Sequence, residues 1–395
     1  MKSKTILIVS ASIGQGHIKA ASTIAGELTA AGFSEISNVD FLEAGQFRYP
    51  ALNRLQKELL NLMKSSYYGL LKTAPTVYKG LYKITENQQA HRVIAFMNAA
   101  NRQLMEHLVA EHQPQAVICT HPFPLGAAAA LRSKKGKRFM LAGVITDFTA
   151  HPWWLADKVD HYFVANQELA GSMEQYGIPP GKITASGIPV DCSFSPDGRG
   201  TLCQEPNILI MGGSLGFGSI ETALYKLEGL PQAVRVTVVS GKNEALYRRI
   251  NALKNTLRNT VTVLPFSNRI ASLMREADLL ITKPGGLTCS EALAVNLPMV
   301  LLNPLPGQEE ENARYLHRQG AAFWVQEETD IAVTVAALLD KNSGILQNMR
   351  GKCWEISPQD AGRIIADKVS QFIENQPQEQ YACLEGEQKA GGMTC

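Results

Sequence analysis

One histidine, His17, stands in a glycine-rich turn near the start of the chain, in the stretch ILIVSASIGQGHIKAA at 6–21. An apolar run at 6–9, followed by small residues, Gly14 and Gly16, predicts a strand, a tight turn and the start of a helix. Free backbone N–H groups at such a helix start attract anions, and glycine lets a ligand approach the main chain. His17 would lie at the mouth of that site as a proton acceptor, or it would only cap or pack against the start of the helix.

The same device occurs a second time, because ILIMGGSLGFGSIETA at 208–223 aligns with the first stretch without a gap. The second copy has Ser219 where the first has His17. Such a repeat indicates two domains of one type, each opening with a strand, a glycine turn and a helix. The difference indicates different roles for the two turns. The first would hold a proton acceptor, and the second would make only phosphate or backbone contacts, for which Gly213 and Ser214 are candidates.

Length and composition agree with two domains and limit the function. A chain of 395 residues is too long for one typical core, and 45% hydrophobic residues suit well-buried sheets. A net charge of +2 gives no indication of a nucleic-acid partner, and the seven cysteines show neither metal-site spacing nor a disulfide framework. The apolar run near the start has only the length of a strand, so we expect a cytoplasmic protein without a signal peptide or membrane span.

The elements that must position the turns form an α/β pattern. Apolar runs alternate with helical patterns through both halves and predict doubly wound parallel sheets. Further strands are expected at 36–41, 116–122, 139–147, 161–166 and 183–190, and then at 207–213, 235–241, 261–266, 278–286, 298–303 and 321–326. The predicted parts are a first domain at 1–191, a linker at 192–206, a second domain at 207–357, a helix at 358–376 that packs back on the first domain, and a disordered tail at 377–395.

The stretch 46–92 breaks the alternation, because basic and aromatic residues are interleaved there at helical spacing. Basic residues exceed acidic ones by six, and the aromatic residues include Tyr67 and Tyr68. This pattern predicts a helix on an anionic membrane surface, and a solvated basic face over an ordinary core is the alternative. Nucleic acid is less favoured because no known nucleic-acid-binding motif accompanies the patch.

Three segments together resemble one family: GQGHIKAA at 14–21, TDFTAHPWW at 146–154, and DLLITKPGGLTCSEALAVNLPMVLLNPLPGQEEENARYL at 278–316. They are similar to the glycosyltransferases that include plant monogalactosyldiacylglycerol synthases, bacterial processive diacylglycerol glucosyltransferases and, more distantly, the N-acetylglucosaminyltransferase that forms lipid II. The resemblance extends to about residue 375. It implies a GT-B fold, in which two Rossmann-like domains face each other across a cleft, with the UDP-sugar on the second domain and the lipid acceptor on the first.

The resemblance also implies how the diphosphate is bound. No metal or other cofactor is expected, and the chain has no Asp-x-Asp pair of the kind that metal-dependent sugar transferases use. Amides at a helix start would hold the diphosphate instead. The segment PGGLTCSEA supplies Gly285 and Gly286 for the turn, Thr288 for a hydroxyl and an amide, and Glu291 to accept hydrogen bonds from the ribose hydroxyls.

Other loops complete the implied donor site and face the acceptor. Gln308, Glu309 and Asn312 would recognise sugar hydroxyls, Phe266 would pack on the uracil ring or in the core, and Gly241 with Lys242 would approach phosphate. On the acceptor side, Asp147 follows an apolar strand at the edge where open parallel sheets bind ligands. His151, Trp153 and Trp154 suit a loop beside a lipid headgroup, and a packed core pair of tryptophans is the alternative.

These residues together predict an inverting transferase that moves a hexose, glucose being favoured, from a UDP-sugar to diacylglycerol or to a glycosyl-diacylglycerol. His17 would take the proton, with Asp147 as the competing base or as its orienting partner. We expect peripheral attachment to the cytoplasmic face of the cell membrane. The alternatives are a UDP-sugar epimerase or hydrolase, N-acetylglucosaminyl transfer to another lipid, a non-catalytic UDP-sugar sensor and, more weakly, a dehydrogenase with Asp40 on the ribose.

Overall fold

The computed structural model describes residues 5–12, 14–44, 90–135, 139–196, 205–213, 216, 219–358 and 360–375. The basic segment predicted at 46–92, with Tyr67 and Tyr68, lies outside these residues apart from its last three positions. Ser214, most of the predicted linker and the tail expected at 377–395 also lie outside them.

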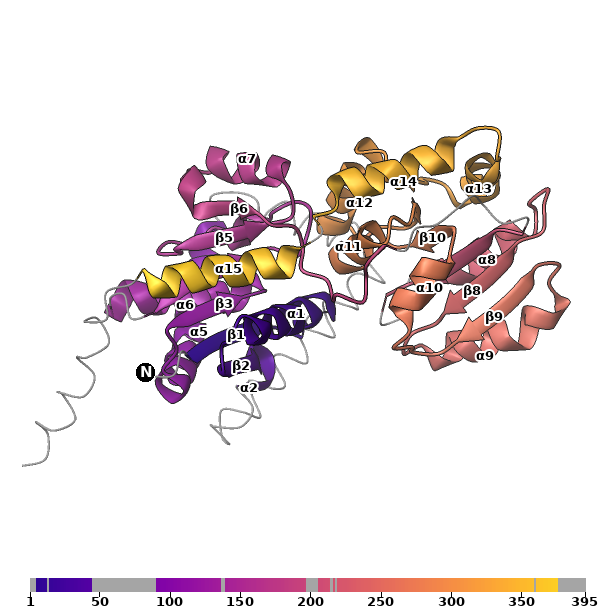
Figure 1. The fold of residues 1–395 in the computed structure, drawn as a ribbon. Helices are drawn as coiled ribbons and strands as arrows, with labels where there is room; N and C mark the ends of the chain where they lie inside the picture. The colour runs from indigo at the N-terminus through magenta and orange to yellow at the C-terminus, as the bar shows by residue number, and fades with distance from the viewer. Residues whose placement is uncertain are drawn as a thin grey trace, which may run out of the picture.

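A six-stranded parallel sheet forms the centre of the first half of the chain, in the order β2-β1-β3-β4-β5-β6 (Figure 1). Buried apolar runs form β1 (Thr5–Ser10), β3 (Ala116–Cys119), β4 (Met140–Val144) and β5 (His161–Val164). The two edge strands, β2 (Glu35–Asp40) and β6 (Ile183–Ala185), are only partly buried. The order reverses between β1 and β3, so the loops after these two strands meet at the point where doubly wound sheets bind ligands.

A second six-stranded sheet has the order β12-β11-β10-β7-β8-β9, with all neighbouring strands parallel. Its strands are β7 (Asn207–Met211), β8 (Arg235–Val239), β9 (Thr260–Leu264), β10 (Leu279–Thr282), β11 (Met299–Leu301) and β12 (Ala322–Trp324). Here the order reverses between β7 and β10, which places the second glycine turn beside the PGG turn. The predicted α/β class with two Rossmann-like parallel sheets is confirmed.

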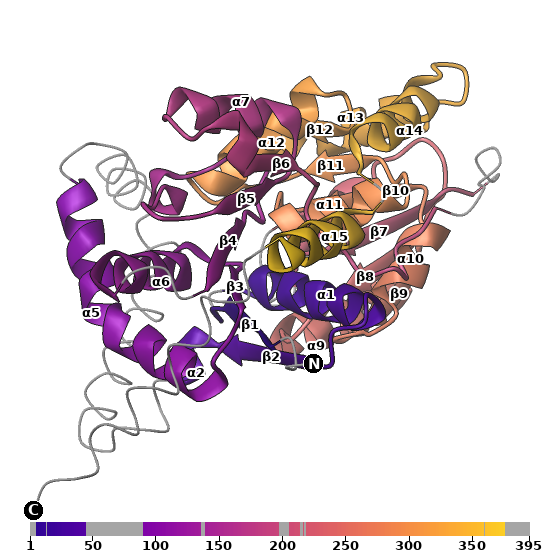
Figure 2. The same ribbon diagram turned by 60° about the vertical axis from the view of Figure 1, so that its left-hand side comes forward.

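Helices cover both faces of each sheet, as Figures 1 and 2 show. The first domain has α1 (Gly16–Ala30), α2 (Phe41–Ala44), α5 (Ala90–His112), α6 (Pro122–Lys135) and α7 (Gln167–Gln175). The second has α8 (Ile220–Leu227), α9 (Glu244–Leu253), α10 (Ile270–Glu276), α11 (Gly286–Ala294), α12 (Gln308–Arg318), α13 (Ile331–Leu339) and α14 (Ile345–Ile356). Short 3₁₀ turns are η1 (Pro152–Trp154), η2 (Pro180–Lys182), η3 (Lys254–Thr256) and η4 (Glu328–Asp330).

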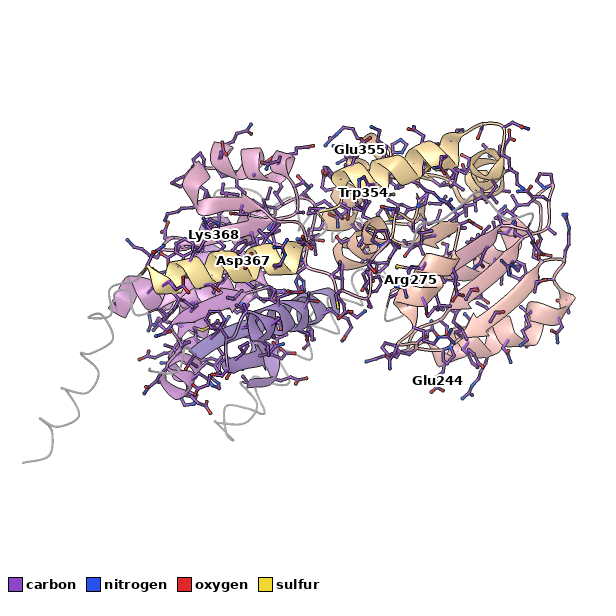
Figure 3. All side chains as sticks on the ribbon, viewed as in Figure 1. Glu244, Arg275, Trp354, Glu355, Asp367 and Lys368 are labelled. Atoms are coloured by element: carbon purple, nitrogen blue, oxygen red, sulfur yellow. The ribbon has the colours of Figure 1, made fainter. Side chains whose placement is uncertain are left out.

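The last helix that the structure describes, α15 (Ala361–Glu374), crosses back and packs beside α1 of the first domain (Figures 1 and 2). Its apolar stripe, which includes Ile365, Ala366 and Val369, joins one core cluster with residues of β1, β3, β4 and β5. Figure 3 labels Asp367, an exposed residue, on the outer side of the same helix. Residues 361–374 therefore contribute to the core of the first domain.

Another core cluster extends over both domains, because it contains Leu7 and Val9 of β1 together with Leu287 of α11 and Leu316 of α12. The carboxyl ends of the two sheets thus meet through packed side chains. Among the residues that the structure describes, no helix is long and apolar enough to cross a membrane.

Candidate active site between the two domains

The first glycine turn meets the second domain. Gly14 has a φ of +89°, a left-handed conformation that favours glycine. Gly16 opens α1, and a Cβ placed on it would be 3.5 Å from Cβ of Leu287 in α11. The turn between β1 and α1 therefore lies against the start of the helix that follows the PGG segment.

His17 is the second residue of α1, and its ring is anchored to the loop after β3. Nδ1 lies 2.7 Å from the backbone carbonyl of Thr120, and the Thr120 hydroxyl donates to the His17 carbonyl at 3.0 Å. Because a carbonyl only accepts, the proton of the neutral ring is on Nδ1, and Nε2 is left with a free lone pair. Burial lowers the pKa of His17, while the charge of Asp147 and the bond to Thr120 raise it.

Asp147 lies three residues beyond β4, next to Thr146, whose hydroxyl is 2.9 Å from Nδ1 of His17. Burial raises the pKa of Asp147, while a hydrogen bond from Asn312 and the nearby His17 lower it. The charges of Glu309 and Lys283 act in opposite directions on the same carboxyl group. The structure thus brings the two predicted bases, His17 and Asp147, to one place and couples their charges.

The start of α11 lies directly against this pair. A Cβ on Gly286 would be 2.1 Å from the carbonyl oxygen of Thr146 and 2.9 Å from Oδ1 of Asp147, so only glycine fits there. The first intrahelical bond of α11 runs from Cys289 N to the Gly285 carbonyl. The N–H groups of the first turn, which includes the half-buried Thr288, therefore have no partner within the helix, and they carry the positive end of its dipole.

Lys283, which is not among the residues predicted from the sequence, supplies a positive charge beside this helix start. Its Nζ lies 3.8 Å from where a Cβ on Gly285 would be. Its Cε lies 3.5 Å from where a Cβ on Gly213 would be. The ammonium group forms an ion pair with Glu309, whose other carboxylate oxygen accepts from the Leu305 amide at 3.0 Å. A lysine directly before Pro-Gly-Gly at a strand end was the signal that could have found it.

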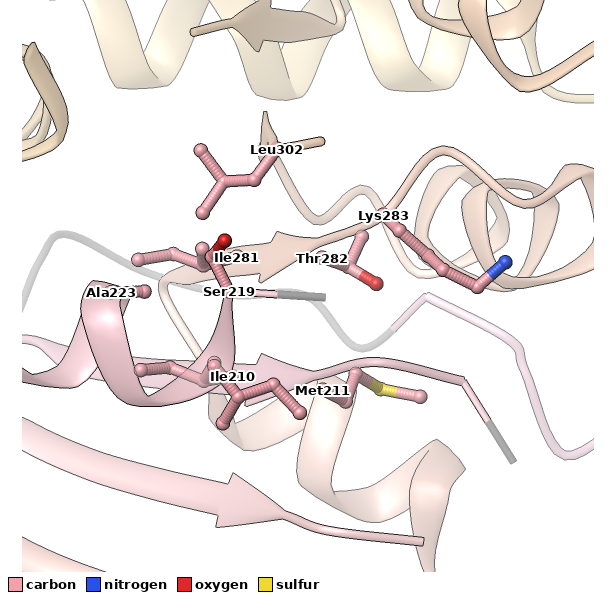
Figure 4. A pocket seen from close by; sticks show the side chains of 9 residues that line it. Ile210, Met211, Ser219, Ala223, Ile281, Thr282, Lys283 and Leu302 are labelled. Atoms are coloured by element: carbon pink, nitrogen blue, oxygen red, sulfur yellow. The ribbon is translucent and has the colours of Figure 1, made fainter. Parts of the chain in front are cut away.

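A small pocket opens between the ends of β7 and β10, beside Lys283 (Figure 4). It is lined by Ile210, Met211, Ser219, Ile220, Ala223, Ile281, Thr282, Lys283 and Leu302. The buried hydroxyl of Thr282 has no hydrogen-bond partner among the described residues, whereas the Ser219 hydroxyl donates to Glu328. The pocket thus places the Thr282 hydroxyl, which has no partner among the described residues, beside the second glycine turn.

The residues expected to bind ribose and sugar lie on α11 and α12 and reach the first domain. Glu291 is buried and pairs with Lys19 of α1 at 3.3 Å. Gln308 and Glu309 open α12 and are half-buried. Asn312 differs from the expectation, because its side chain is fully buried and its amide is used in contacts between the domains.

The remaining donor residues lie at the strand ends of the second sheet. Gly241 has a φ of +60°, and Lys242 beside it is exposed. Phe266 follows β9 and is 51% exposed, which rules out the alternative that it is a core residue. The side chains of Lys242 and Phe266 are therefore open to a ligand.

On the acceptor side, a row of rings extends from His17 to the tryptophan loop. His17 contacts His121 with ring centroids 4.7 Å apart, His121 contacts Phe123 at 4.7 Å, and Phe123 contacts Trp153 at 5.3 Å. His151 accepts from the Trp153 amide, and burial lowers its pKa to about 4, so it is neutral at pH 7. His121 and Phe123 are not among the residues predicted from the sequence, and the THPF segment after β3 was the signal that could have found them.

Trp154 is a correction to the expected acceptor loop. It is only 1% exposed and packs in the core, so of the two tryptophans only the half-buried Trp153 can reach a ligand. The alternative given from the sequence, a tryptophan packed in the core, therefore holds for Trp154.

Comparison with known proteins agrees with these observations. Residues 17–190 match the model of the monogalactosyldiacylglycerol (MGDG) synthase family, and residues 207–354 match the glycosyltransferase family 28 C-terminal domain. The processive diacylglycerol beta-glucosyltransferase of Bacillus cereus (strain 03BB102) is 30% identical over 374 residues, which are 92% of this chain and 93% of that protein. The chain belongs to the MGDG synthase family of glycosyltransferases. The corresponding protein of Bacillus anthracis (strain A0248) has the same identity and coverage.

Solved structures with little sequence identity share the fold of this MGDG synthase family member. MurG of Acinetobacter baumannii has a TM-score of 0.62 at 17% identity and covers 93% of this chain and 99% of its own. The calicheamicin glycosyltransferase CalG4 has a TM-score of 0.59 at 14% identity, with 95% and 99% covered. The predicted GT-B fold is thereby confirmed. UDP-GlcNAc 2-epimerase from Neisseria meningitidis, with a TM-score of 0.56 at 13% identity and 93% and 100% covered, shows that the fold alone does not fix the reaction.

Proposed function

We propose that the protein transfers a hexose from a UDP-sugar to the free hydroxyl of diacylglycerol, or to the sugar of a glycolipid already made. One observation carries the proposal: Thr146 and Asp147, which lie beside His17, also lie directly against the start of α11, where the two domains touch. A base and an anion-binding helix start are the two groups that glycosyl transfer requires. The names of the curated relatives support diacylglycerol as acceptor.

In this mechanism the acceptor oxygen attacks the anomeric carbon from the side opposite to UDP. The bond between that carbon and the diphosphate oxygen breaks, and the hydroxyl proton passes to Nε2 of His17. The configuration at the anomeric carbon therefore inverts. Asp147 raises the pKa of the ring and so stabilises the imidazolium that forms.

The departing diphosphate gains negative charge, which the second domain is equipped to stabilise. The free amides at the start of α11 face that charge, and Lys283 can exchange Glu309 for phosphate oxygens. The positions of Gly213 and Gly285 around the Lys283 side chain support this assignment. In this proposal the UDP-sugar is the only co-substrate and no metal cofactor is required.

Glucose is the donor sugar that we favour, because the PGQEEEN form resembles the bacterial glucosyl enzymes. Incubation of the purified protein with diacylglycerol vesicles and several UDP-hexoses, followed by separation of the lipid products, tests the reaction directly. Hexosyl-diacylglycerol is the expected product. Free hexose or an epimerised nucleotide sugar without glycolipid would show a hydrolase or an epimerase, and tight UDP-sugar binding without any product would show a sensor.

We also propose that the protein binds the cytoplasmic face of the membrane peripherally. The excess of basic residues at 46–92 supports this, since each basic residue near an anionic surface contributes about 1 kcal/mol. Co-sedimentation with vesicles should therefore fall as salt rises. Equal binding to neutral and anionic vesicles at low salt would show that the basic segment does not attach the protein to anionic membranes.

A further inference from the structure

Asn312, in the second turn of α12, is a side chain shared between the domains. Its Oδ1 accepts from the backbone N–H of Phe148 at 2.9 Å, and its Nδ2 donates to Oδ1 of Asp147 at 2.9 Å and to the Pro284 carbonyl at 3.1 Å. Both N–H groups of the amide are used, and the residue is 0% exposed. In this arrangement no N–H of Asn312 is left for a sugar hydroxyl.

The segment that Asn312 holds, residues 146–148, also holds His17. Thr146 contacts the ring nitrogen of His17 through its hydroxyl, and its carbonyl lies against Gly286 at the start of α11. Phe148 stacks on Tyr315 of α12 with centroids 5.3 Å apart and 15° between the planes. One short segment of the first domain is thus fixed by α11 and α12 of the second.

We propose that Asn312 is a positioning residue that couples domain closure to catalysis: by clamping residues 146–148 onto the second domain, it sets Asp147 and His17 in place against the donor. The proposal rests on the proposed function of the site. It gives Asn312 a role in the geometry of the base, in place of the sugar recognition expected from the sequence. When the domains separate, the hydrogen bonds of Asn312 to Asp147 and Phe148 are lost and the two bases lose their common support.

Kinetics of Asn312→Ala and Asn312→Asp test the proposal, with thermal unfolding as a check of folding. We expect kcat to fall about 100-fold in both variants, because a displacement near 1 Å at a reacting group costs that much. The fall should be the same for every UDP-hexose that is accepted, and the Kd for UDP should not change. Arg318→Ala is the control, because it breaks a different contact between the domains, the exposed ion pair with Glu168, and should leave kcat unchanged.

Two kinetic results would overturn the clamp. A retained kcat with an altered ratio of kcat/KM between UDP-glucose and UDP-galactose would make Asn312 a sugar-recognition residue, and a wild-type kcat in either folded variant would remove any role in positioning. The isosteric Asn312→Asp carries the test if Asn312→Ala does not fold.

Hydrogen exchange separates failure of the clamp from failure of the proposed function. The Phe148 amide should exchange faster in Asn312→Ala, which removes its acceptor, than in the wild type or in Arg318→Ala, whether or not any sugar is transferred. If the wild type makes no glycolipid while the exchange changes as expected, the proposed reaction is wrong and the clamp stands. Unchanged exchange at Phe148 would reject the clamp.

Discussion

The pKa values of His17 and Asp147 are each shifted by two opposing effects, burial and the charge of the other residue. Burial favours the neutral form of each, whereas each charged form stabilises that of the other. The contact of Nδ1 with Thr120 leaves Nε2 of His17 as a defined acceptor, and the Asn312 amide already occupies one oxygen of Asp147. This geometry favours His17 as the base and Asp147 as its charged partner.

Replacing His17 with Ala should therefore remove most glycolipid synthesis while UDP binding and thermal unfolding stay the same. Loss of a general base typically lowers the rate by about 100-fold to 10,000-fold. Ser219→Ala, at the matching place in the second domain, should have a much smaller effect, since among the described residues the Ser219 hydroxyl bonds Glu328 and Asn303 and no group of the His17 site. Near-normal turnover of His17→Ala would move the base to Asp147.

The pH dependence distinguishes the two roles. A histidine base must be neutral, so the rate falls as pH drops through its pKa, which burial places below the ordinary value of 6.5. The Asp147 carboxylate raises that pKa. Asp147→Asn should therefore shift the acid limb of the profile of kcat/KM against pH to lower pH. A residual rate without any acid limb would instead identify Asp147 as the titrating base.

At the scale of elements, local pattern predicted what each strand and turn would be, and it could not predict which loops meet. The strands, the glycine turns and the PGG helix start follow from apolar runs and from Gly14, Gly16 and Gly286. The contacts of His17 with Thr120 and His121 depend on β3 lying next to β1, which no single segment encodes. The burial of Trp154 and the clamp through Asn312 depend in the same way on packing between distant elements.

The close approach of α11 to the first domain should be sensitive to one methyl group. Gly286→Ala places a Cβ 2.1 Å from the Thr146 carbonyl, so the segment that carries Asp147 must move. We expect glycolipid synthesis to fall about 100-fold, as for other small displacements at a reacting site.

Gly26→Ala is the matched control for this substitution. Gly26 lies in the interior of α1, and a Cβ there meets nothing within 4 Å. It should leave kcat unchanged and stabilise the helix by up to about 1 kcal/mol, since alanine has the higher helix propensity. Equal kcat values for the two variants would show that catalysis does not need the contact between Gly286 and Thr146.

At the scale of the whole molecule, the chain returns after α14 of the second domain to the domain where it began, and α15 packs there beside α1. Ile365 is 0% exposed within the core formed with β1 and α1. Ile365→Ala should lower the free energy of unfolding by about 2–5 kcal/mol, as expected for a buried isoleucine. Ile345→Ala, at a residue that is 41% exposed, should change it by less than about 0.5 kcal/mol.

Urea unfolding followed by separate probes for each domain measures this difference. Although Ile365 follows the second domain in the sequence, its loss should lower the transition of the first domain, because its core partners Ile6, Ile24 and Phe163 all lie there. The second domain keeps its own cluster on β7, β8 and β10 and should unfold as in the wild type. Equal effects of Ile365→Ala and Ile345→Ala would mean that α15 does not pack into the core of the first domain in solution.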